Sequence, residues 1–338
     1  MLRSICIPSN RNLKLVQENI ETTLHYVQSS NDIELVIADN SNDKSKESFL
    51  GNLKNDKFNY LISEFKKPTD NFFHCLNESK GKFVSNIGDD DKIIRLGDKK
   101  FENISDDVVG FRPSFVVYTK DYGVTNFSNF SIIENSALLR INEYFKKNGG
   151  NNNTLYSFFK KNIVLDVQKL IQKHPFRNTG YFDWSIVLAY IAEGKIISDP
   201  STVIFYDNTR WTTNEQISSS ITDLFISEDL NPKLADYLLM LLAIDSFILL
   251  ARKNSRLDNQ ERFSTAFTIM NSYLDNFFKS INTIKFDATE INMINQMMSY
   301  SDFNNKFRVF LKIIDYLSPG KSAAYEFFML DSTDIKIS

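Results

Sequence analysis

Three consecutive aspartates, Asp89–Asp91, make up the part of the sequence whose chemistry is easiest to state. Carboxylates so close together repel one another, so some of them keep their protons unless a cation neutralises them. Oxygen ligands suit Mg²⁺ or Mn²⁺, which proteins hold with one or two carboxylates and the phosphates of a substrate. The alternative is a solvated acidic turn ahead of a helix, where aspartate is favoured. The run alone does not decide between a metal site and a turn.

The elements around this run predict where it lies. Short apolar runs predict strands at Ser4–Pro8, Glu34–Ala38, Tyr60–Ser63 and Lys82–Ile87. Helices are predicted between them, for example over Lys44–Leu53 and Pro68–Glu78. Such alternation indicates a mostly parallel sheet, in which ligands bind at the carboxyl ends of the strands. Asp39 and the Asp89–Asp91 run both follow predicted strands, so they should converge on one crevice.

The second half of the chain changes character. Strands are predicted at Val108–Thr119 and Thr202–Phe205, and a helix at Asp183–Glu193. Beyond about residue 212 the strand pattern ends, and residues 217–330 have helical periodicity throughout. The expected fold class is therefore α/β, with a mostly parallel sheet followed by an all-helical C-terminal region.

The composition of the chain argues against several classes of function. The 338 residues carry a net charge of −3, which leaves no basic excess for nucleic-acid binding. Two cysteines and three histidines are too few for a disulfide framework or a metal centre of those ligands, and no glycine-rich phosphate-binding motif is present. The apolar stretch Leu234–Leu250 contains Asp236 and Asp245, which favours a buried helix over a membrane crossing. The N-terminus has no signal-peptide pattern, so a cytoplasmic location is expected.

Four segments resemble the GT-A glycosyltransferases, especially family 2, over about residues 1–212. They are SICIPSNRN, ELVIADNSND, NFFHCLNESKGKFVSNIGDDD and YFDWSIVLAYIAEGK. The resemblance implies a Rossmann-like GT-A domain, with residues 1–112 binding a nucleotide sugar and residues 113–215 binding the acceptor. The helical region, residues 216–338, lies outside it.

The same resemblance assigns the nucleotide-binding residues. Pro8, Ser9 and Asn10 should wrap the nucleotide, and Asp39 should hydrogen-bond its base or ribose. Asn71 matches an asparagine on the helix flanking the nucleotide. Each position also has a structural interpretation: Pro8 can simply end a strand, and Asp39 can simply form an Asx turn.

The acidic run departs from the family's usual D-x-D pattern. One alignment places Gly88 in the first acidic position and Asp90 in the second, whereas the other pairs Asp89 with Asp91. We favour Asp90 as the main ligand of Mn²⁺ or Mg²⁺, with Asp89 and Asp91 contacting the sugar, the metal or its bound water.

Asp183 aligns with the family's catalytic base. Phe182 replaces the glutamate that usually precedes this base. A pocket lined by Tyr181, Phe182 and Trp184 should desolvate the carboxyl group of Asp183 and raise its pKa toward neutrality. The alternative is that Asp183 only caps the following helix.

The segment IFYDNTRW stands where relatives often have a histidine-containing lid over the diphosphate. Asn208, Arg210 and Trp211 fill this segment, and Arg210 would stabilise the leaving group. An ordinary surface arginine explains the residue equally well.

The implied activity is that of an inverting, metal-dependent glycosyltransferase. Its donor is a nucleotide-diphosphate sugar, with UDP-sugars commonest among relatives. Its acceptor is a hydroxyl of a glycan or lipid-linked oligosaccharide in capsule, O-antigen or other surface-polysaccharide synthesis. The helical region is expected to contact the inner face of the membrane or form a homodimer. The alternative is a non-catalytic GT-A scaffold subunit; a nucleotidyltransferase is less well supported, because the first loop lacks glycines.

Overall fold

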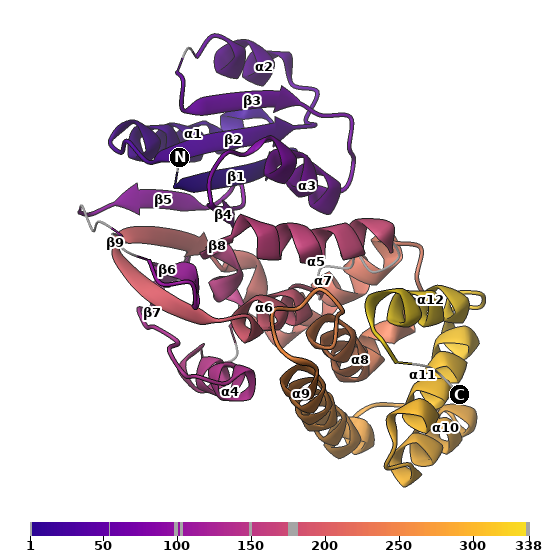
Figure 1. Cartoon of the computed structure of the whole chain (residues 1–338). Helices are drawn as coiled ribbons and strands as arrows, with labels where there is room; N and C mark the ends of the chain where they lie inside the picture. The colour runs from indigo at the N-terminus through magenta and orange to yellow at the C-terminus, as the bar shows by residue number, and fades with distance from the viewer. Residues whose placement is uncertain are drawn as a thin grey trace. The chain divides into compact units, whose positions relative to one another are not determined.

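Figure 1 shows the computed structural model of the chain. It describes residues 2–53, 55–97, 101, 104–148, 151–174 and 182–335. The chain divides into two compact units. The sheet unit comprises Met1–Lys169 and Glu193–Thr212, and the helical unit comprises Leu170–Ala192 and Thr213–Ser338. The chain thus leaves the sheet unit at Thr212, and the segment Leu170–Ala192 also belongs to the helical unit.

The sheet unit is built on one mixed sheet. Its strands are β1 (Arg3–Ser9), β2 (Ile33–Asp39), β3 (Phe58–Ile62), β4 (Phe83–Asn86), β5 (Lys92–Arg95), β6 (Val108–Thr119), β7 (Gly123–Ser128), β8 (Phe158–Lys160) and β9 (Lys195–Asp207). They run in the order β3-β2-β1-β4-β8-β6-β9-β5, with β7 paired to β6. The first four strands are parallel, as the strand–helix alternation predicts, and β6 is parallel to β9. The pairings of β8, β5 and β7 are antiparallel.

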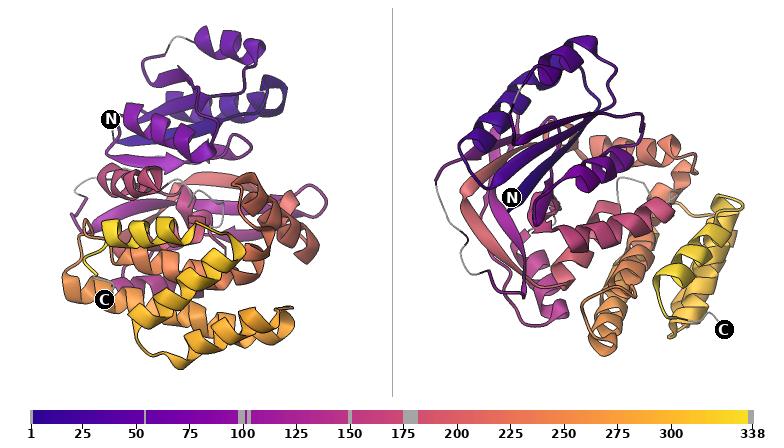
Figure 2. Two further views of the ribbon diagram at one scale, coloured as in Figure 1. Left: turned by 90° about the vertical axis from the view of Figure 1, so that its right-hand side faces the viewer. Right: turned by 45° about the horizontal axis from the view of Figure 1, so that its top comes forward.

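Helices flank the parallel strands, which lie side by side in the views of Figure 2. The helical elements of this unit are α1 (Leu13–Gln28), α2 (Lys44–Gly51), α3 (Pro68–Glu78), α4 (Ala137–Asn148), η1 (Asn153–Tyr156), η4 (Thr209–Trp211) and the start of α5 (Lys161–Lys173). The residues Val16, Ile20 and Val27 recur at helical spacing on one face of α1 and are buried against the strands. Fully burying one such aliphatic side chain stabilises the fold by roughly 1.5–3 kcal/mol. This core fixes the strand ends that carry polar residues.

The helical unit confirms the predicted all-helical C-terminal region. It contains α6 (Asp183–Ala192), α7 (Asn214–Ser227), η5 (Pro232–Tyr237), α8 (Leu238–Leu250), α9 (Asn259–Ser280), η6 (Ile281–Thr283), α10 (Ala288–Ser299), α11 (Phe303–Leu317) and α12 (Ser322–Ser332). The apolar stretch predicted to be a buried helix is η5 and α8, and every residue from Met240 to Leu250 is buried. Within the described residues, no helix combines the length and apolar character that crossing a membrane requires.

Candidate functional site

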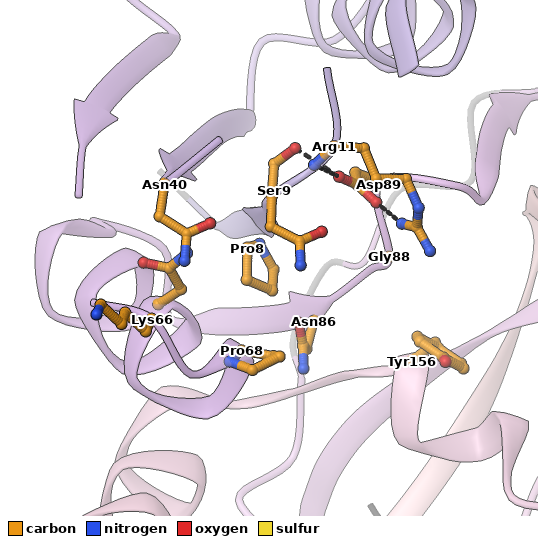
Figure 3. Close-up of a pocket in the computed structure, with 12 residues that line it drawn as sticks. Pro8, Ser9, Arg11, Asn40, Lys66, Pro68, Asn86, Gly88, Asp89 and Tyr156 are labelled. Carbon is orange, nitrogen blue, oxygen red and sulfur yellow. Dashed lines mark hydrogen bonds and ion pairs between the residues drawn. The ribbon is translucent and has the colours of Figure 1, made fainter. Parts of the chain in front are cut away.

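A pocket of about 260 Å³ opens at the carboxyl ends of the parallel strands (Figure 3). Its lining comes from the ends of β1, β2 and β4, from the start of α3 and from η1. The residues that line it are Pro8, Ser9, Asn10, Arg11, Asn40, Lys66, Pro68, Asn71, Asn86, Gly88, Asp89 and Tyr156. Five of the residues expected to bind a nucleotide sugar are therefore gathered around one cavity.

Strand register explains why these residues meet. Ser9 at the end of β1 lies opposite Asp39 at the end of β2, and Cys6 of β1 lies opposite Asn86 at the end of β4. The backbone N–H of Asn40 donates to the carbonyl oxygen of Ser9 at 3.0 Å, which joins the two strand ends. Asp39 and the acidic run were predicted to converge on one crevice. They do meet at one edge of the sheet through the contacts that follow, but Asp89 lines the pocket and Asp39 does not.

Asp39 is held by a buried lysine. Lys46 of α2 is fully buried, and its Nζ lies 2.9 Å from Oδ1 of Asp39. The same Nζ donates to Ser9 Oγ at 2.6 Å and to the carbonyl oxygen of Arg11 at 2.9 Å. Burial lowers the pKa of Lys46, and the contact with Asp39 opposes that shift. The ammonium group thereby ties β1, β2 and the loop after β1 together.

The remaining contacts of Asp39 are structural as well. Its Oδ2 accepts a hydrogen bond from the hydroxyl group of Tyr60 at 2.9 Å, and its Oδ1 accepts one from the backbone N–H of Ser41 at 3.0 Å. The latter bond is the Asx turn that the sequence offered as an alternative. Asp39 is 5% exposed and does not line the pocket, whereas its neighbour Asn40 does.

The acidic run is engaged by Arg11. The guanidinium group of Arg11 bridges two carboxylates, with Nη1 on Asp89 and Nη2 on Asp90 at 2.8 Å. Asp89 is 2% exposed and also accepts a hydrogen bond from Ser9 Oγ at 2.6 Å. Figure 3 shows Arg11 and Asp89 at the side of the pocket away from Asn40 and Lys66. Hydrogen-bonded links thus run from Asp39 through Lys46 and Ser9 to Asp89.

Asp91 has different partners from the other two aspartates. It is buried, and its carboxyl group accepts hydrogen bonds from the backbone N–H groups of Gly88 and Asp207. Burial raises the pKa of Asp91 to about 8, and the neighbouring charge of Asp90 adds to this shift. Asp91 therefore fastens the acidic turn to the end of β9.

Gly88 lies close to the carboxylates that follow it. A Cβ atom at this position would lie 2.7 Å from Oδ1 of Asp90 and 3.1 Å from Oδ2 of Asp91. This is a physical reason for glycine in the place where relatives have their first acidic residue.

The acidic run offers few side-chain ligands for a divalent cation. Among the side chains that the structure describes, no three or more His, Cys, Asp or Glu residues are grouped so as to hold a metal ion. A cation that arrives with phosphate oxygens needs only one or two carboxylates from the protein. Asp90, whose side chain is 36% exposed, and Asp89 fit that smaller requirement. Their pairing with Arg11 means that such a cation competes with the guanidinium group.

Asp183, the predicted catalytic base, is the first residue of α6 in the helical unit. Burial raises the pKa of this carboxyl group to about 7, although the side chain is partly accessible to solvent. Burial is the single cause of the shift within the described residues, so no capping hydrogen bond to α6 offsets it. The buried Phe182 precedes Asp183 as expected, while Tyr181 lies outside the described residues.

The segment predicted to act as a lid begins at the end of β9. The backbone N–H of Asn208 donates to the carbonyl oxygen of Tyr118 at 2.8 Å, and that of Trp211 donates to the carbonyl oxygen of Asn208 at 3.0 Å. Asp207, which contacts Asp91, accepts a hydrogen bond from the backbone N–H of Thr209 at 2.9 Å. The segment is therefore anchored next to the acidic turn. The side chain of Arg210 lies outside the described part of the chain.

Several residues of the site were not identified from the sequence. They include Arg11, Asn40 and Lys46, together with Lys66, Pro68, Asn86 and Tyr156 of the pocket lining. Arg11 and Asn40 directly follow matched residues, so their position in the chain was a usable signal. Lys46 offered none, because it resembles the solvent-exposed Lys44 two residues earlier in the same helix.

Comparison with known proteins gives likeness at the level of the fold. No family model and no curated protein sequence matches the chain. Among solved structures, residues 1–349 of TarS from S. aureus match with 14% identity and a TM-score of 0.48, covering 98% of this chain and 88% of that one. The same protein bound to UDP and to UDP-GlcNAc matches with 13% identity and a TM-score of 0.47, covering 98% of this chain and 88% and 89% of those chains.

Proposed function

We propose that the chain is a glycosyltransferase that uses a nucleotide-diphosphate sugar, with a UDP-sugar as the expected donor. The observation that carries this proposal is the pocket at the strand ends, which gathers Pro8, Ser9, Asn10, Asn71 and Asp89 around one cavity. These are residues that the resemblance to GT-A enzymes assigns to the nucleotide sugar. These five residues come from strand, loop and helix segments between Pro8 and Asp89, and the fold brings them together.

The pocket has chemically distinct sides. Asn40, Lys66 and Pro68 lie on one side, and Arg11, Gly88 and Asp89 lie on the other (Figure 3). The amide and proline side suits a planar base with hydrogen-bonding edges. The charged side would suit the diphosphate once a divalent cation is held by Asp89 and Asp90, because Arg11 is already paired with these two carboxylates.

The proposed reaction is a single displacement with inversion at the anomeric carbon. Asp183 takes the proton of the acceptor hydroxyl group as that oxygen attacks the anomeric carbon, and the bond to the diphosphate oxygen breaks. The raised pKa of Asp183 supports this role, because a base works best when its pKa lies near the operating pH. The donor site's part is to hold the sugar nucleotide in line with the attacking oxygen.

Asp90, with Asp89 beside it, would hold Mn²⁺ or Mg²⁺. A bound divalent cation neutralises the charge that develops on a departing diphosphate. Asp91 is assigned a positioning role, since its carboxyl group joins the acidic turn to Asp207. Asn208, Arg210 and Trp211 remain the proposed leaving-group segment, supported by this anchoring of its first residue.

The acceptor, the location and the partners remain proposals from the resemblance. They are a glycan or lipid-linked oligosaccharide acceptor, action in the cytoplasm at the inner face of the membrane, and a helical region that contacts the membrane surface or a second copy.

The test is nucleotide release from a panel of UDP-, GDP-, CDP- and dTDP-sugars with Mn²⁺, Mg²⁺ or EDTA. Slow hydrolysis of the donor by water removes the need to know the acceptor. We expect metal-dependent release from one donor, which is lost in Asp90→Ala and in Asp183→Ala. Release that is unchanged in both variants would contradict the assignment of these residues.

A second candidate is a non-catalytic scaffold subunit on the same fold. Arg11 favours it, because its guanidinium group already neutralises Asp89 and Asp90 without a metal ion. Absence of both nucleotide release and metal-dependent nucleotide binding would favour the scaffold.

A further inference from the structure

The side-chain amide of Asn40 has a hydrogen-bond partner at its nitrogen and none at its oxygen among the described residues. Its Nδ2 donates a hydrogen bond to the carbonyl oxygen of Phe65, which fixes the orientation of the amide because a carbonyl only accepts. Its Oδ1 is buried and has no hydrogen-bond partner among the described residues. Leaving a buried acceptor without a partner is unfavourable. Since Asn40 lines the pocket, a ligand with an N–H donor would satisfy this oxygen.

Asn71 presents the complementary group. Its Oδ1 accepts a hydrogen bond from Ser63 Oγ, and Ser63 Oγ in turn accepts one from the backbone N–H of Phe65 at 3.3 Å. This arrangement leaves Nδ2 of Asn71 as the end that can donate to a ligand. Asn71 is 1% exposed and lines the same pocket as Asn40. The Ser63–Phe65 segment therefore orients both amides: Ser63 bonds to Asn71, and Phe65 bonds to Asn40.

Asp39 is poorly placed to provide the acceptor, because its side chain is 4% exposed and it does not line the pocket. Its Oδ1 is bound to Lys46 and its Oδ2 to Tyr60. Withdrawing either oxygen would leave the buried ammonium group of Lys46 or the hydroxyl group of Tyr60 without its partner. The acceptor without a partner at the end of β2 is consequently one residue further along, at Asn40, which lines the pocket.

We propose that Asn40, and not Asp39, selects the base of the nucleotide, by accepting a hydrogen bond from N3–H of a uracil ring. Asn71 Nδ2 donates to a neighbouring carbonyl oxygen of the same ring, and Pro8 and Pro68 supply apolar walls. In the same pose cytosine turns a lone pair at N3 toward Oδ1 of Asn40, which is repulsive. A volume of about 260 Å³ lies just below the usual range for small-molecule pockets and favours a pyrimidine over a purine. This inference rests on the proposed function.

The test measures dissociation constants by calorimetry for UDP, CDP and N3-methyl-UDP. The proteins are the wild type, Asn40→Leu and the control Asn52→Leu, which is exposed at the end of α2 and lies outside the pocket. We expect the wild type and the control to bind UDP about ten- to a hundredfold more tightly than the other two ligands. In Asn40→Leu the three affinities should lie within about threefold of one another, because the acceptor that discriminates them is gone.

Two results would overturn the inference. The first is wild-type affinities for UDP, CDP and N3-methyl-UDP that are alike, a comparison that needs no variant to fold. The second is an Asn40→Leu protein that keeps the wild-type preference for UDP. Either result leaves nucleotide binding, and with it the proposed function, intact. Absence of binding by every nucleoside diphosphate would instead reject the proposed function together with the inference.

Discussion

Lys46 and Asp39 form a fully buried ion pair, with Nζ 2.9 Å from Oδ1, beneath the pocket at the strand ends. Their side chains are 0% and 4% exposed. The lysine also donates to Ser9 Oγ, which itself donates to Asp89. A single ammonium group thus connects the end of β2 to the acidic turn after β4. The geometry of the pocket therefore depends on a residue that does not line it.

Replacing Lys46 by methionine should destabilise the fold. The substitution keeps the length of the side chain but leaves Asp39 as a buried carboxylate without its counter-charge, which typically costs about 3–5 kcal/mol. The matched control is Lys44→Met in the same helix, whose side chain is 87% exposed and pairs with Glu47 on the surface. That exposed pair is worth less than about 1 kcal/mol. Urea unfolding measures both, and equal losses for the two variants would refute the role given to Lys46.

Gly88→Ala should disturb the acidic turn. The added Cβ would lie 2.7 Å from Oδ1 of Asp90, so the Asp90 side chain must move and its contact with Arg11 must adjust with it. Gly51→Ala is the control, because no atom lies within 4 Å of its added Cβ. It sits at the end of α2, where alanine should leave stability unchanged or raise it by less than about 1 kcal/mol. We expect only Gly88→Ala to weaken UDP binding, measured by calorimetry; unaltered binding and stability would show that the turn tolerates a side chain.

Arg11→Gln should strengthen metal binding in the absence of nucleotide. The guanidinium group occupies the two carboxylates that a cation needs, and hydrogen bonds to charged groups are worth about 1.5–3 kcal/mol. The dissociation constant for Mn²⁺, measured by electron paramagnetic resonance, should fall about tenfold or more. Lys14→Gln, an exposed substitution on α1, controls for the loss of one positive charge. If both variants bind Mn²⁺ as the wild type does, Arg11 does not compete for the site.

The pH dependence of activity should follow Asp183. With its pKa raised to about 7, the fraction of the basic form falls tenfold per pH unit below that value, and the transfer rate should fall with it. Asp183→Asn should lower the rate by about 10²–10⁴ while leaving UDP affinity unchanged. A wild-type rate that is flat between pH 5 and pH 8 would contradict the assignment.

Stability offers a second readout for the same carboxyl group. The folded pKa, about 7, lies above the ordinary value of 3.8, so between these values the folded state keeps a proton that the unfolded state releases. The contribution of Asp183 to the free energy of unfolding is therefore full below about pH 4 and is lost as pH rises through 7. The Asp183→Asn variant should lack that decline when urea unfolding is compared at pH 5 and pH 8. Parallel pH profiles for the two proteins would show that the pKa is not raised.

The parallel half of the sheet could be predicted because local pattern and tertiary structure agree there. The helix predicted over Pro68–Glu78 and the strand predicted over Val108–Thr119 match α3 and β6 residue for residue. The strands β5, β7 and β8 were not predicted. They are short or, in β7, largely exposed, so their pairing is set by the long strands β6 and β9 and not by their own periodicity.

The sequence predicted which residues line the pocket better than it predicted the partners of their charged neighbours. Pro8, Ser9 and Asn71 line the pocket as expected, because strand ends and helix starts place them there. The state of Asp39 was not predictable, since it depends on Lys46 folding back from α2. Likewise, the engagement of Asp90 depends on the side chain of Arg11, and sequence patterns carry no information about which partner a charged group selects.

A crystal structure of the chain grown with UDP and Mn²⁺ would show whether the pocket at the strand ends binds the nucleotide. We expect density for UDP in this pocket, with the uracil ring between Asn40 and Asn71 and the diphosphate beside Gly88 and Asp89. UDP bound at any other place, or a pocket that stays without nucleotide at saturating UDP, would contradict this expectation.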